Sequence, residues 1–506
     1  MKIKYSFQWF YRHKGLLALV LLYLVSAPLY ASNYPLQIIQ PQPNLDVQNR
    51  FYKAYPGLEY NVRLAVSGGA YPYEFKLDAA PAGMTIDKRG EITWPNPPAA
   101  GTPYTVQVSV TDMELTTTNV TWTITVTTSG FRFLDAINGK SAAQGGTGSI
   151  DNPWKSVADF YEGNVYDSKY ANSYSGEFLY WRTGTYGMDG YTEPSGKDRA
   201  IPFINNRKPN VWLAYPGEKP VLDLSAGNIS IYSGGRNTYI DGFEINVNNN
   251  GNGMGITVPS SANNVTFRRN NIYGINNGYS GGNCSLLFIT NAKKDGSFFS
   301  IQDNEMHDVY WGYAVLGYSA KNVLVEDNLV YNISRGHSLS AKMGTQLWTF
   351  RANRLMNNSK TSINIQYYND AFESGNIEIL HNIIEAGGGP MVFNTTFTAR
   401  GGPVHVYRNT IMDTITANNI TATNGMFRFY DNVIVNDIQN QNKITTVELL
   451  DPSRFIVQNN LTGSLTTKIV DSQGVLTASY EQYVGVRGHQ LTARPARPTE
   501  VIVVTQ

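Results

Sequence analysis

Lys342 is the residue of this 506-residue chain whose setting most suggests chemistry. It ends an alternating, strand-like run in the segment HSLSAKMGTQLWTFRANRL, residues 337–355. A lysine can act as a general base when burial or neighbouring cations lower its pKa. Cleavage of an acidic polysaccharide by β-elimination needs such a base, a group that stabilises the enolate, and an acid for the leaving oxygen. Lys342 is therefore a candidate base, or else a solvated residue on the outer wall of a repetitive fold.

The residues around Lys342 predict a polar and aromatic surface suited to sugars. Alternation turns Leu339 and Ala341 inward, so Lys342 and the two serines of this run share the outer face. The next such segment, SINIQYY, turns Ile363 and Ile365 inward and exposes its polar side chains. The preceding segment, DVYWGYAVLGYS, adds aromatic rings with flat faces. The candidate substrate-binding residues are Tyr310, Trp311, Tyr313, Tyr318, Ser338, Ser340, Asn364 and Gln366.

A recurring unit predicts the element that positions these residues. Apolar residues stand at positions 0, 2 and 7 of the unit and asparagine at position 5, as in VTFRRNNI, VLVEDNLV and FRFYDNVI. The apolar period of two excludes a helical repeat, and the distance between units matches one coil of a parallel β-helix. We expect each asparagine to take the left-handed conformation at a corner and to bond the asparagine one coil away. These asparagines are Asn270, Asn304, Asn328, Asn353, Asn382, Asn409, Asn432 and Asn460.

Residues 33–128 consist of short alternating runs, such as YNVRLAVSG and YTVQVSVTD, separated by Gly- and Pro-rich segments. This spacing predicts a β-sandwich. The pattern PYEFKLDAAPAGMTIDKRGEITW resembles bacterial immunoglobulin-like and cadherin-like domains of exported proteins, which are mostly spacers or adhesive units. The predicted fold class is all-β. The predicted domains are a signal peptide (1–31), an immunoglobulin-like β-sandwich (32–128), a right-handed parallel β-helix (130–465) and a C-terminal cap or tail (466–506).

The N-terminus predicts export. A basic segment precedes the apolar run LLALVLLYLV, and the small residues of SAPLYAS follow, with cleavage expected after Ala31. Its removal leaves 36 basic against 39 acidic residues, so the net charge falls from +1 to −3, which disfavours nucleic acid as a partner. The apolar run is short for a membrane span, so no stable span is expected after cleavage. Cys284 is the sole cysteine, which excludes an intramolecular disulfide. We expect a secreted bacterial protein, either periplasmic or extracellular at the cell surface.

From GFRFLDAINGKSAAQGGTGSIDNPWKSVADF onward, the chain resembles the right-handed parallel β-helix family that includes pectate lyases, alginate lyases and chondroitinase B. The Lys342 segment is similar to the lysine-bearing strand of the alginate lyase and chondroitinase B type. In that type the lysine is the base, an arginine one coil on is the acid, and a calcium ion neutralises the uronate. The resemblance therefore implies that Lys342 is the base.

Two positions depart from that family pattern. Gln366 stands in the place of the arginine, so Tyr367 or Tyr368 becomes the candidate acid. His337 stands in the place of a calcium-binding glutamate and is a further catalytic candidate. Calcium prefers hard oxygen ligands, so a histidine there disfavours it. We expect no metal or other cofactor, with calcium as the one alternative.

The sequence favours a lyase that cleaves an acidic, uronate-containing glycan. The missing arginine favours the rival interpretation, a non-catalytic carbohydrate-binding or surface-structural β-helix protein. A glycoside hydrolase ranks third, because it needs two facing carboxylates. The chain has no Asp-Asp pair, and Gly336-His337-Ser338 matches only part of the Gly-His-Gly of polygalacturonase-like proteins. A polysaccharide is the expected partner under all three interpretations.

Overall fold

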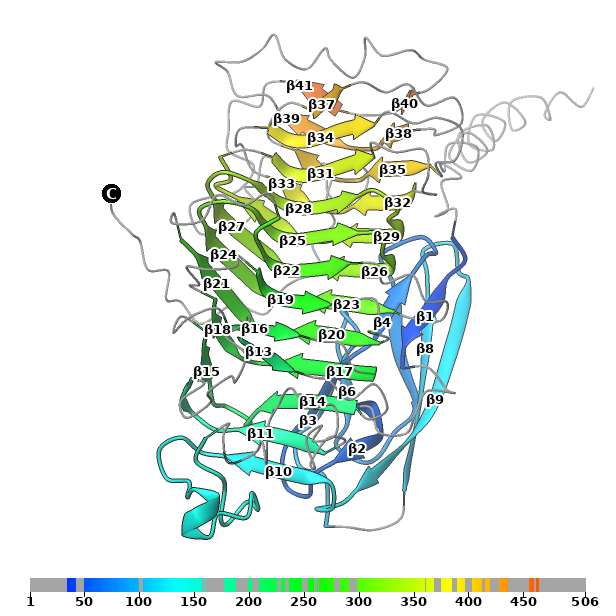
Figure 1. Cartoon of the computed structure of the whole chain (residues 1–506). Coiled ribbons are helices and arrows are strands. Elements are labelled where there is room, and N and C mark those ends of the chain that lie inside the picture. Colours follow the sequence, from blue (N-terminus) through cyan, green and yellow to red (C-terminus); the bar gives the residue numbers. More distant parts are fainter. Residues whose placement is uncertain are drawn as a thin grey trace, which may run out of the picture.

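The structure is a computed structural model of the whole chain, shown in Figure 1. The predicted signal peptide and the predicted C-terminal cap or tail lie outside the residues that it describes. The described residues are 34–41, 50–99, 103–156, 159, 177–187, 199–202, 209–224, 229–232, 236–247, 254–258, 262, 264–276, 283–290, 298–359, 361–367, 375–384, 389–395, 403–411, 415–418, 427–435, 455–458 and 461–463.

Three parallel sheets form a β-helix, because successive coils each add a strand to the sheets beneath them (Figure 1). The first sheet contains β10 (Phe131–Leu134), β11 (Phe178–Trp181), β14 (Pro209–Ala214), β17 (Arg236–Asp241), β20 (Val265–Arg268), β23 (Phe299–Gln302), β26 (Lys321–Glu326), β29 (Gln346–Arg351), β32 (Gly375–Leu380), β35 (Val404–Tyr407), β38 (Phe427–Tyr430) and β40 (Phe455–Gln458).

The other two sheets run beside the first in the same chain direction. The second sheet contains β12 (Gly184–Tyr186), β15 (Pro220–Asp223), β18 (Glu244–Asn246), β21 (Asn271–Ile275), β24 (Glu305–Val309), β27 (Leu329–Ile333), β30 (Arg354–Met356), β33 (Ile383–Ile384), β36 (Thr410–Ile411), β39 (Val433–Val435) and β41 (Leu461–Gly463). The third sheet contains β13 (Arg199–Pro202), β16 (Ile229–Tyr232), β19 (Met254–Val258), β22 (Ser285–Thr290), β25 (Tyr313–Tyr318), β28 (His337–Lys342), β31 (Thr361–Tyr367), β34 (Gly389–Thr395) and β37 (Ile415–Asn418).

The N-terminal region is built from small, mainly antiparallel sheets, as the alternating runs predict. A short 3-10 helix, η1 (Arg50–Tyr52), lies in this region, and a second, η2 (Ala142–Gln144), follows β10. The sheets consist of β1 (Gln37–Gln40) with β4 (Ala65–Ser67), of β2 (Lys53–Ala54), β9 (Thr117–Val126), β8 (Tyr104–Thr111) and β5 (Glu74–Ala79), and of β3 (Tyr60–Arg63), β7 (Glu91–Trp94) and β6 (Thr85–Ile86). Val62, Ile92 and Val108 are fully buried in the core of this immunoglobulin-like domain. The predicted all-β architecture, a β-sandwich followed by a parallel β-helix, is confirmed.

The interior of the β-helix is filled by the apolar positions of the recurring unit. Val325, Phe350 and Ile379 stack in register on β26, β29 and β32, and all three are fully buried. Trp348 is also buried, and its indole nitrogen donates a hydrogen bond to the carbonyl of Ala320 at 3.0 Å. The coil therefore explains the apolar and aromatic residues that follow Lys342 in the sequence.

The recurring asparagines form a continuous buried ladder. The amide nitrogen of Asn328 donates to Oδ1 of Asn353 at 2.9 Å, and that of Asn353 donates to Oδ1 of Asn382 at 3.0 Å. Each side chain also donates to a backbone carbonyl of the coil before, as Asn353 does to Val325 at 2.8 Å. The predicted bonding between coils is confirmed from Asn270 to Asn432. Asn460 lies outside the described residues.

The predicted left-handed backbone at these asparagines is wrong. The residue before each ladder asparagine takes that conformation instead, with φ of 59° at Asp303, 55° at Asp327 and 55° at His381. The asparagine itself must keep an ordinary backbone, because its side chain is directed along the stack to bond the next coil. Residues of several types therefore take the left-handed backbone at the corner. The asparagine recurs because its side-chain amide forms the hydrogen bonds of the ladder.

The immunoglobulin-like domain lies along the outer face of the first sheet, with β1, β4, β8 and β9 beside it in Figure 1. Near the start of the β-helix, the contact is aromatic. Tyr55 packs edge-on against Phe131 and Phe133 of β10 at ring-centre distances of 5.4 and 5.2 Å. Further along, Thr266 of β20 donates a hydrogen bond to Gln40 at 2.8 Å. The outer face of the first sheet is therefore covered in this region, and Lys342 belongs to the third sheet.

Candidate active site

Lys342 is held between two tyrosine rings at the end of β28. Its ammonium donates a hydrogen bond to the hydroxyl of Tyr313 at 2.5 Å and lies 4.4 Å from the centre of the same ring. The ring of Tyr318, which is in register with Lys342 on the neighbouring strand β25, lies 5.3 Å away. Only 6% of the Lys342 residue surface is exposed. The prediction that it is a solvated residue is therefore wrong, and tyrosines have replaced much of its water.

Burial lowers the pKa of Lys342 to about 8. The charged form loses hydration in this position, and among the described residues no carboxylate forms an ion pair with it. The two aromatic faces and the Tyr313 hydroxyl are weaker partners than a carboxylate would be. A lysine with this pKa carries a neutral, proton-accepting amine on part of the molecules near neutral pH. That is the property that a general base requires.

The serines beside Lys342 are on the outward side of β28, as predicted, but they are not exposed. Ser338 and Ser340 are fully buried, and Asn364 of the next coil is 1% exposed. The amide of Asn364 donates to the hydroxyl of Ser340 at 2.9 Å, so these two side chains bond each other. Small side chains in a stack of strands about 4.8 Å apart are easily covered by larger neighbours. The expectation that these three line an exposed groove is wrong in this respect.

Gln366 and the two tyrosines after it have different positions relative to Lys342. Gln366 is the register partner of Lys342 on β31, and it is half-buried. Tyr367 is the last residue of β31, where its backbone pairs with Thr395 of β34. Tyr368 lies outside the described residues. Gln366 is therefore beside Lys342 in the sheet, as the sequence predicts, while the roles of the two tyrosines as acids stay predictions.

His337 is at the opposite end of β28 from Lys342, and Tyr313 lies between them. The rings of Tyr313 and His337 have their centres 5.5 Å apart, and the backbone of His337 donates to the carbonyl of Gly312 at 2.9 Å. His337 contacts Tyr313, and Tyr313 contacts Lys342. The histidine is therefore linked to the candidate base through Tyr313.

Two of the aromatic residues predicted to bind glycan contact other side chains of the protein, and their glycan contacts stay predictions. Trp311 packs against the buried core of the β-helix. The guanidinium of Arg335 lies 5.1 Å from the centre of the Tyr310 ring, which covers one face of it. Tyr318 remains half-buried, and its hydroxyl donates to Asn283 at 3.3 Å. The structure therefore places Tyr313 and Tyr318 around the amine, with Gln366 as the register partner of Lys342, while Tyr310 and Trp311 contact other groups.

The positions that the family resemblance assigns to a calcium site do not suit that ion. His337 offers a ring nitrogen where a carboxylate is needed, and calcium takes six to eight oxygen ligands. Within the described ranges, no group of three or more His, Cys, Asp or Glu side chains is placed to hold a metal. We therefore derive no step through a metal ion.

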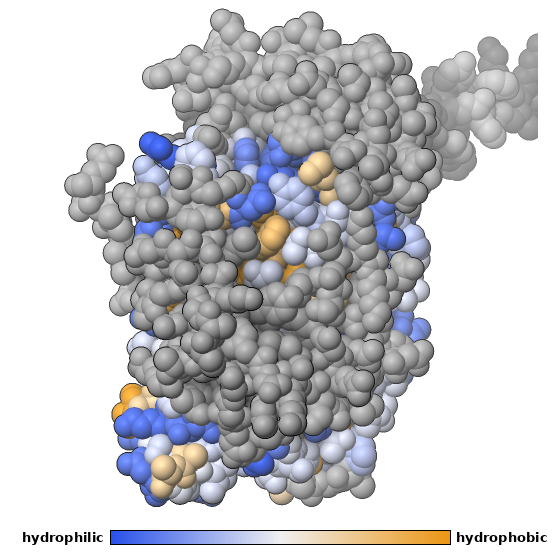
Figure 2. Space-filling model, viewed as in Figure 1, coloured by the Kyte–Doolittle hydropathy of each residue, from blue (hydrophilic) through white to orange (hydrophobic). Residues whose placement is uncertain are grey.

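The face that contains Lys342 combines polar and apolar surface. Figure 2 shows hydrophilic and hydrophobic residues side by side at mid-height, over the part of the β-helix where β22, β25 and β28 lie in Figure 1. Lys342 ends β28 of the third sheet, whereas the immunoglobulin-like domain contacts the first sheet.

One feature was missed by sequence reasoning, a network of charged residues between the two domains. Arg63 of β3 and Asp303, after β23, form an ion pair at 2.8 Å although 240 residues separate them. A signal was present in the recurring unit, where VTFRRNNI, VLVEDNLV and WTFRANRL have charged residues at outward positions of strands. Such residues are ordinary on a solvated sheet, so the signal could not be distinguished from simple exposure.

Comparisons with known proteins agree with this architecture. Residues 42–127 match the family model described as "Putative Ig domain". No curated protein matches the chain. The described part of the chain has no helix that is long and apolar enough to cross a membrane.

Among solved structures, the chain is similar to a mutant of the periplasmic alginate epimerase AlgG, with 10% identity over 58% of this chain and 72% of that one, at a TM-score of 0.32. It is also similar to the PL6 family alginate lyase AlyGC, with 13% identity over 63% of this chain and 54% of that one, at a TM-score of 0.36. A third, described as a "putative alpha-galactosidase" from Bacteroides fragilis, has 15% identity over 32% of this chain and 40% of that one, at a TM-score of 0.17. The chain thus spans about half the length of the lyase. At this level of similarity, the likeness carries no argument about activity.

Proposed function

We propose that this chain is an exported lyase that cleaves an acidic, uronate-containing polysaccharide by β-elimination, with Lys342 as the base. The observation that supports this most is the state of the Lys342 amine. It is almost fully buried, it touches the Tyr313 hydroxyl, and burial lowers its pKa to about 8. A structural lysine on a sheet wall would be exposed or paired with a carboxylate. Lys342 is 6% exposed, and no carboxylate among the described residues forms an ion pair with it.

The proposed reaction begins with proton abstraction. The neutral Lys342 amine takes the proton from C5 of the uronate, which is acidified by the adjacent carboxylate. Electrons of the broken C5–H bond form the C4–C5 double bond, and the bond from C4 to the glycosidic oxygen breaks. That oxygen must receive a proton as it leaves.

The Tyr313 hydroxyl is the proposed proton donor, because it is the described hydroxyl in direct contact with the amine, at 2.5 Å. It gives its proton to the leaving oxygen and regains one from the Lys342 ammonium through their hydrogen bond. The net change is the transfer of one proton from C5 to the glycosidic oxygen, and both side chains return to their starting state. Tyr367 and Tyr368, the acids expected from the sequence, remain alternative donors.

A non-catalytic glycan-binding protein is the second candidate. Its support is the closed packing around the amine, since Ser338, Ser340 and Asn364 are buried and cannot contact a polymer without rearrangement. A glycoside hydrolase is less well supported, because a hydrolytic pair of carboxylates about 5–10 Å apart is required. The sequence has no Asp-Asp pair of the kind that polygalacturonase-like proteins have.

The test is an absorbance assay for unsaturated uronate ends, run on a panel of alginate, pectate, glucuronan and glycosaminoglycan substrates. A lyase creates a conjugated C4–C5 double bond, which absorbs in the ultraviolet, and a hydrolase creates none. New reducing ends without new absorbance would support hydrolysis. Binding of a uronate polymer without either product would support the non-catalytic candidate.

A further inference from the structure

On the outer face of the first sheet, the residues that stack in register from strand to strand form a column. The residue type in this column changes from coil to coil, although the backbone repeats. Asp241, Arg268, Gln302, Glu326 and Arg351 are register partners on successive strands. Each of these residues is at most 3% exposed. A column of buried charged and polar groups needs partners. Some of these partners are other residues of the β-helix, as Arg351 is for Glu326, and the others come from the immunoglobulin-like domain.

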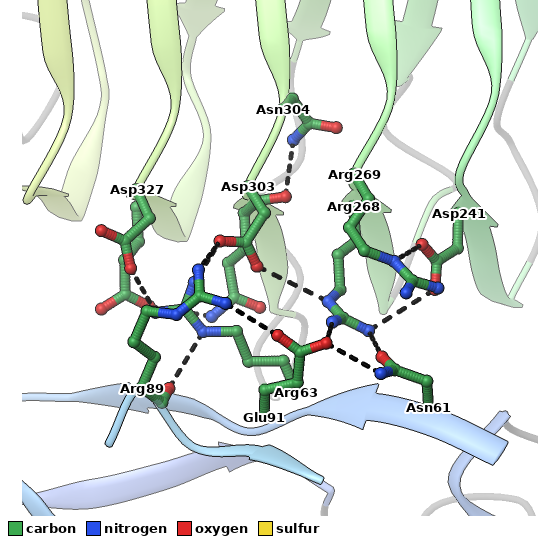
Figure 3. A network of polar contacts seen from close by, with 12 residues as sticks. Asn61, Arg63, Arg89, Glu91, Asp241, Arg268, Arg269, Asp303, Asn304 and Asp327 are labelled. Carbon is green, nitrogen blue, oxygen red and sulfur yellow. Dashed lines mark hydrogen bonds and ion pairs between the residues drawn. The ribbon is translucent and has the colours of Figure 1, made fainter. Parts of the chain in front are cut away.

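Two arginines of that domain reach the β-helix. Arg63 contacts Asp303 at 2.8 Å, Asp327 at 2.5 Å and Glu326 at 3.3 Å. Arg89 contacts the same oxygen of Asp303 at 2.7 Å. Figure 3 shows both guanidinium groups directed toward carboxylates at the ends of neighbouring β-helix strands. The pKa values of Asp303 and Glu326 are held below their usual range, against the effect of burial, by these arginines and by Arg268 and Arg351 of the β-helix itself.

Two arginines of the β-helix reach in the opposite direction. Arg268 contacts Glu91 at 2.8 Å and donates to Oδ1 of Asn61 at 2.5 Å (Figure 3). Arg351 donates to the hydroxyl of Tyr73 at 2.7 Å and is paired with Glu326 of its own sheet at 2.7 Å. The two domains therefore exchange charged groups reciprocally, and neither surface is satisfied without the other.

We propose that this network specifies the position of the immunoglobulin-like domain along the β-helix. A solenoid presents nearly the same backbone every coil, so an apolar partner could bind one coil higher or lower, about 4.8 Å away. Buried ion pairs contribute little net stability, but leaving one partner unpaired is costly. A register defined by such pairs is therefore selective even where it is not strongly stabilising.

Slippage in either direction would oppose like charges. The corner position before the ladder asparagine is Arg269, Asp303, Asp327 and Ala352 on successive coils. If the immunoglobulin-like domain shifted one coil toward the N-terminus of the β-helix, Arg63 would lose its contact with Asp327 and lie against Arg269. If the domain shifted one coil toward the C-terminus, Arg63 would lose its contact with Glu326 and lie against Arg351. Repulsion against the wrong register adds to attraction in the correct one, which is how a specific interface rejects alternatives.

The immunoglobulin-like domain is then an integral lateral wall of the β-helix, with its position set by charge. This differs from the spacer or adhesive role that the sequence resemblance implies. A domain held by buried ion pairs along several coils cannot act as a freely moving arm. It also keeps that part of the first sheet from serving as a glycan surface.

The test is a distance measurement in the full-length chain. Spin labels are attached to Leu115→Cys on the immunoglobulin-like domain and Leu347→Cys on the β-helix, because both positions are exposed. Cys284 is buried and should not be labelled. Pulsed dipolar spectroscopy should give one narrow distance. In the background Arg63→Met/Glu326→Gln/Asp327→Asn, the distribution should broaden or gain a component corresponding to a one-coil shift, about 4.8 Å along the solenoid.

The matched control removes an exposed ion pair of the same domain, Lys76 with Asp78, by Lys76→Met/Asp78→Asn. It should leave the single distance unchanged. If the triple variant does not fold, Arg63→Lys replaces it, because lysine keeps the charge but cannot bridge several carboxylates as a guanidinium does. It should broaden the distribution as well. The same narrow distance in a folded network variant as in the wild type would overturn the proposal.

Discussion

The ammonium of Lys342 lies 2.5 Å from the hydroxyl of Tyr313 and 4.4 Å from the centre of its ring, so one tyrosine contacts it in two ways. The ring face favours a cation, while the hydroxyl can exchange a proton with the amine. This pairing links the burial of the lysine to the proposed chemistry. It also gives substitutions that separate the base from the proton donor.

Replacing the base should abolish turnover. In Lys342→Ala, elimination should fall by about 10²–10⁴-fold, because the variant lacks the amine that accepts the C5 proton. Lys342→Arg should fail similarly, since a guanidinium stays protonated at ordinary pH. The assay is ultraviolet absorbance on the substrate that the wild type cleaves. Lys76→Ala, at an exposed lysine of the immunoglobulin-like domain, is the control and should keep full activity. Full activity in Lys342→Ala would end the assignment of this residue.

The pH dependence should follow the neutral amine. Since burial lowers the pKa of Lys342 to about 8, kcat/KM should rise with pH and level off above that value. The free energy of unfolding should also rise with pH. Between about pH 8 and the ordinary lysine pKa of 10.5, the unfolded state binds more protons, so this group makes unfolding less favourable as pH rises. The slope of stability against pH in this window should decrease in Lys342→Met, and an equal slope would contradict the shifted pKa.

Removing only the Tyr313 hydroxyl should separate the two proton transfers. Tyr313→Phe keeps the ring beside Lys342 but deletes the proposed donor. Elimination should fall by about 10²–10⁴-fold. Exchange of the C5 proton for deuterium, followed by NMR in heavy water, should persist because the base remains. Tyr310→Phe is the control, since that ring is packed against Arg335. Loss of C5 exchange together with elimination would assign Tyr313 to the base step instead.

Breaking the asparagine ladder should destabilise the β-helix. Asn353→Leu leaves the backbone amide of Asn328 and the carbonyl of Val325 without their buried partner. The expected cost is about 1–3 kcal/mol, read from denaturant unfolding. Asn119 is an exposed asparagine on the extended strand β9, and Asn119→Leu should cost much less. Equal midpoints for the two variants would show that the ladder does not contribute as proposed.

Local periodicity was enough to determine the coil architecture. The alternation of apolar residues and the recurrence of asparagine predicted parallel strands, a packed interior and bonds between successive asparagines. These features could be inferred because each depends on residues close together in the sequence and on the same contact made again one coil later. The same pattern placed Lys342 on an outward position of its strand, next to Gln366.

Only the tertiary structure determined which outward residues are exposed. Ser338 and Ser340 obey the predicted alternation and are nevertheless buried, and Tyr313 contacts the amine from the far end of its strand. Arg63 meets Asp303 across 240 residues of chain. Periodicity gives the direction of a side chain relative to its own strand. What covers that side chain, and therefore its hydration, charge partners and pKa, depends on segments distant in sequence.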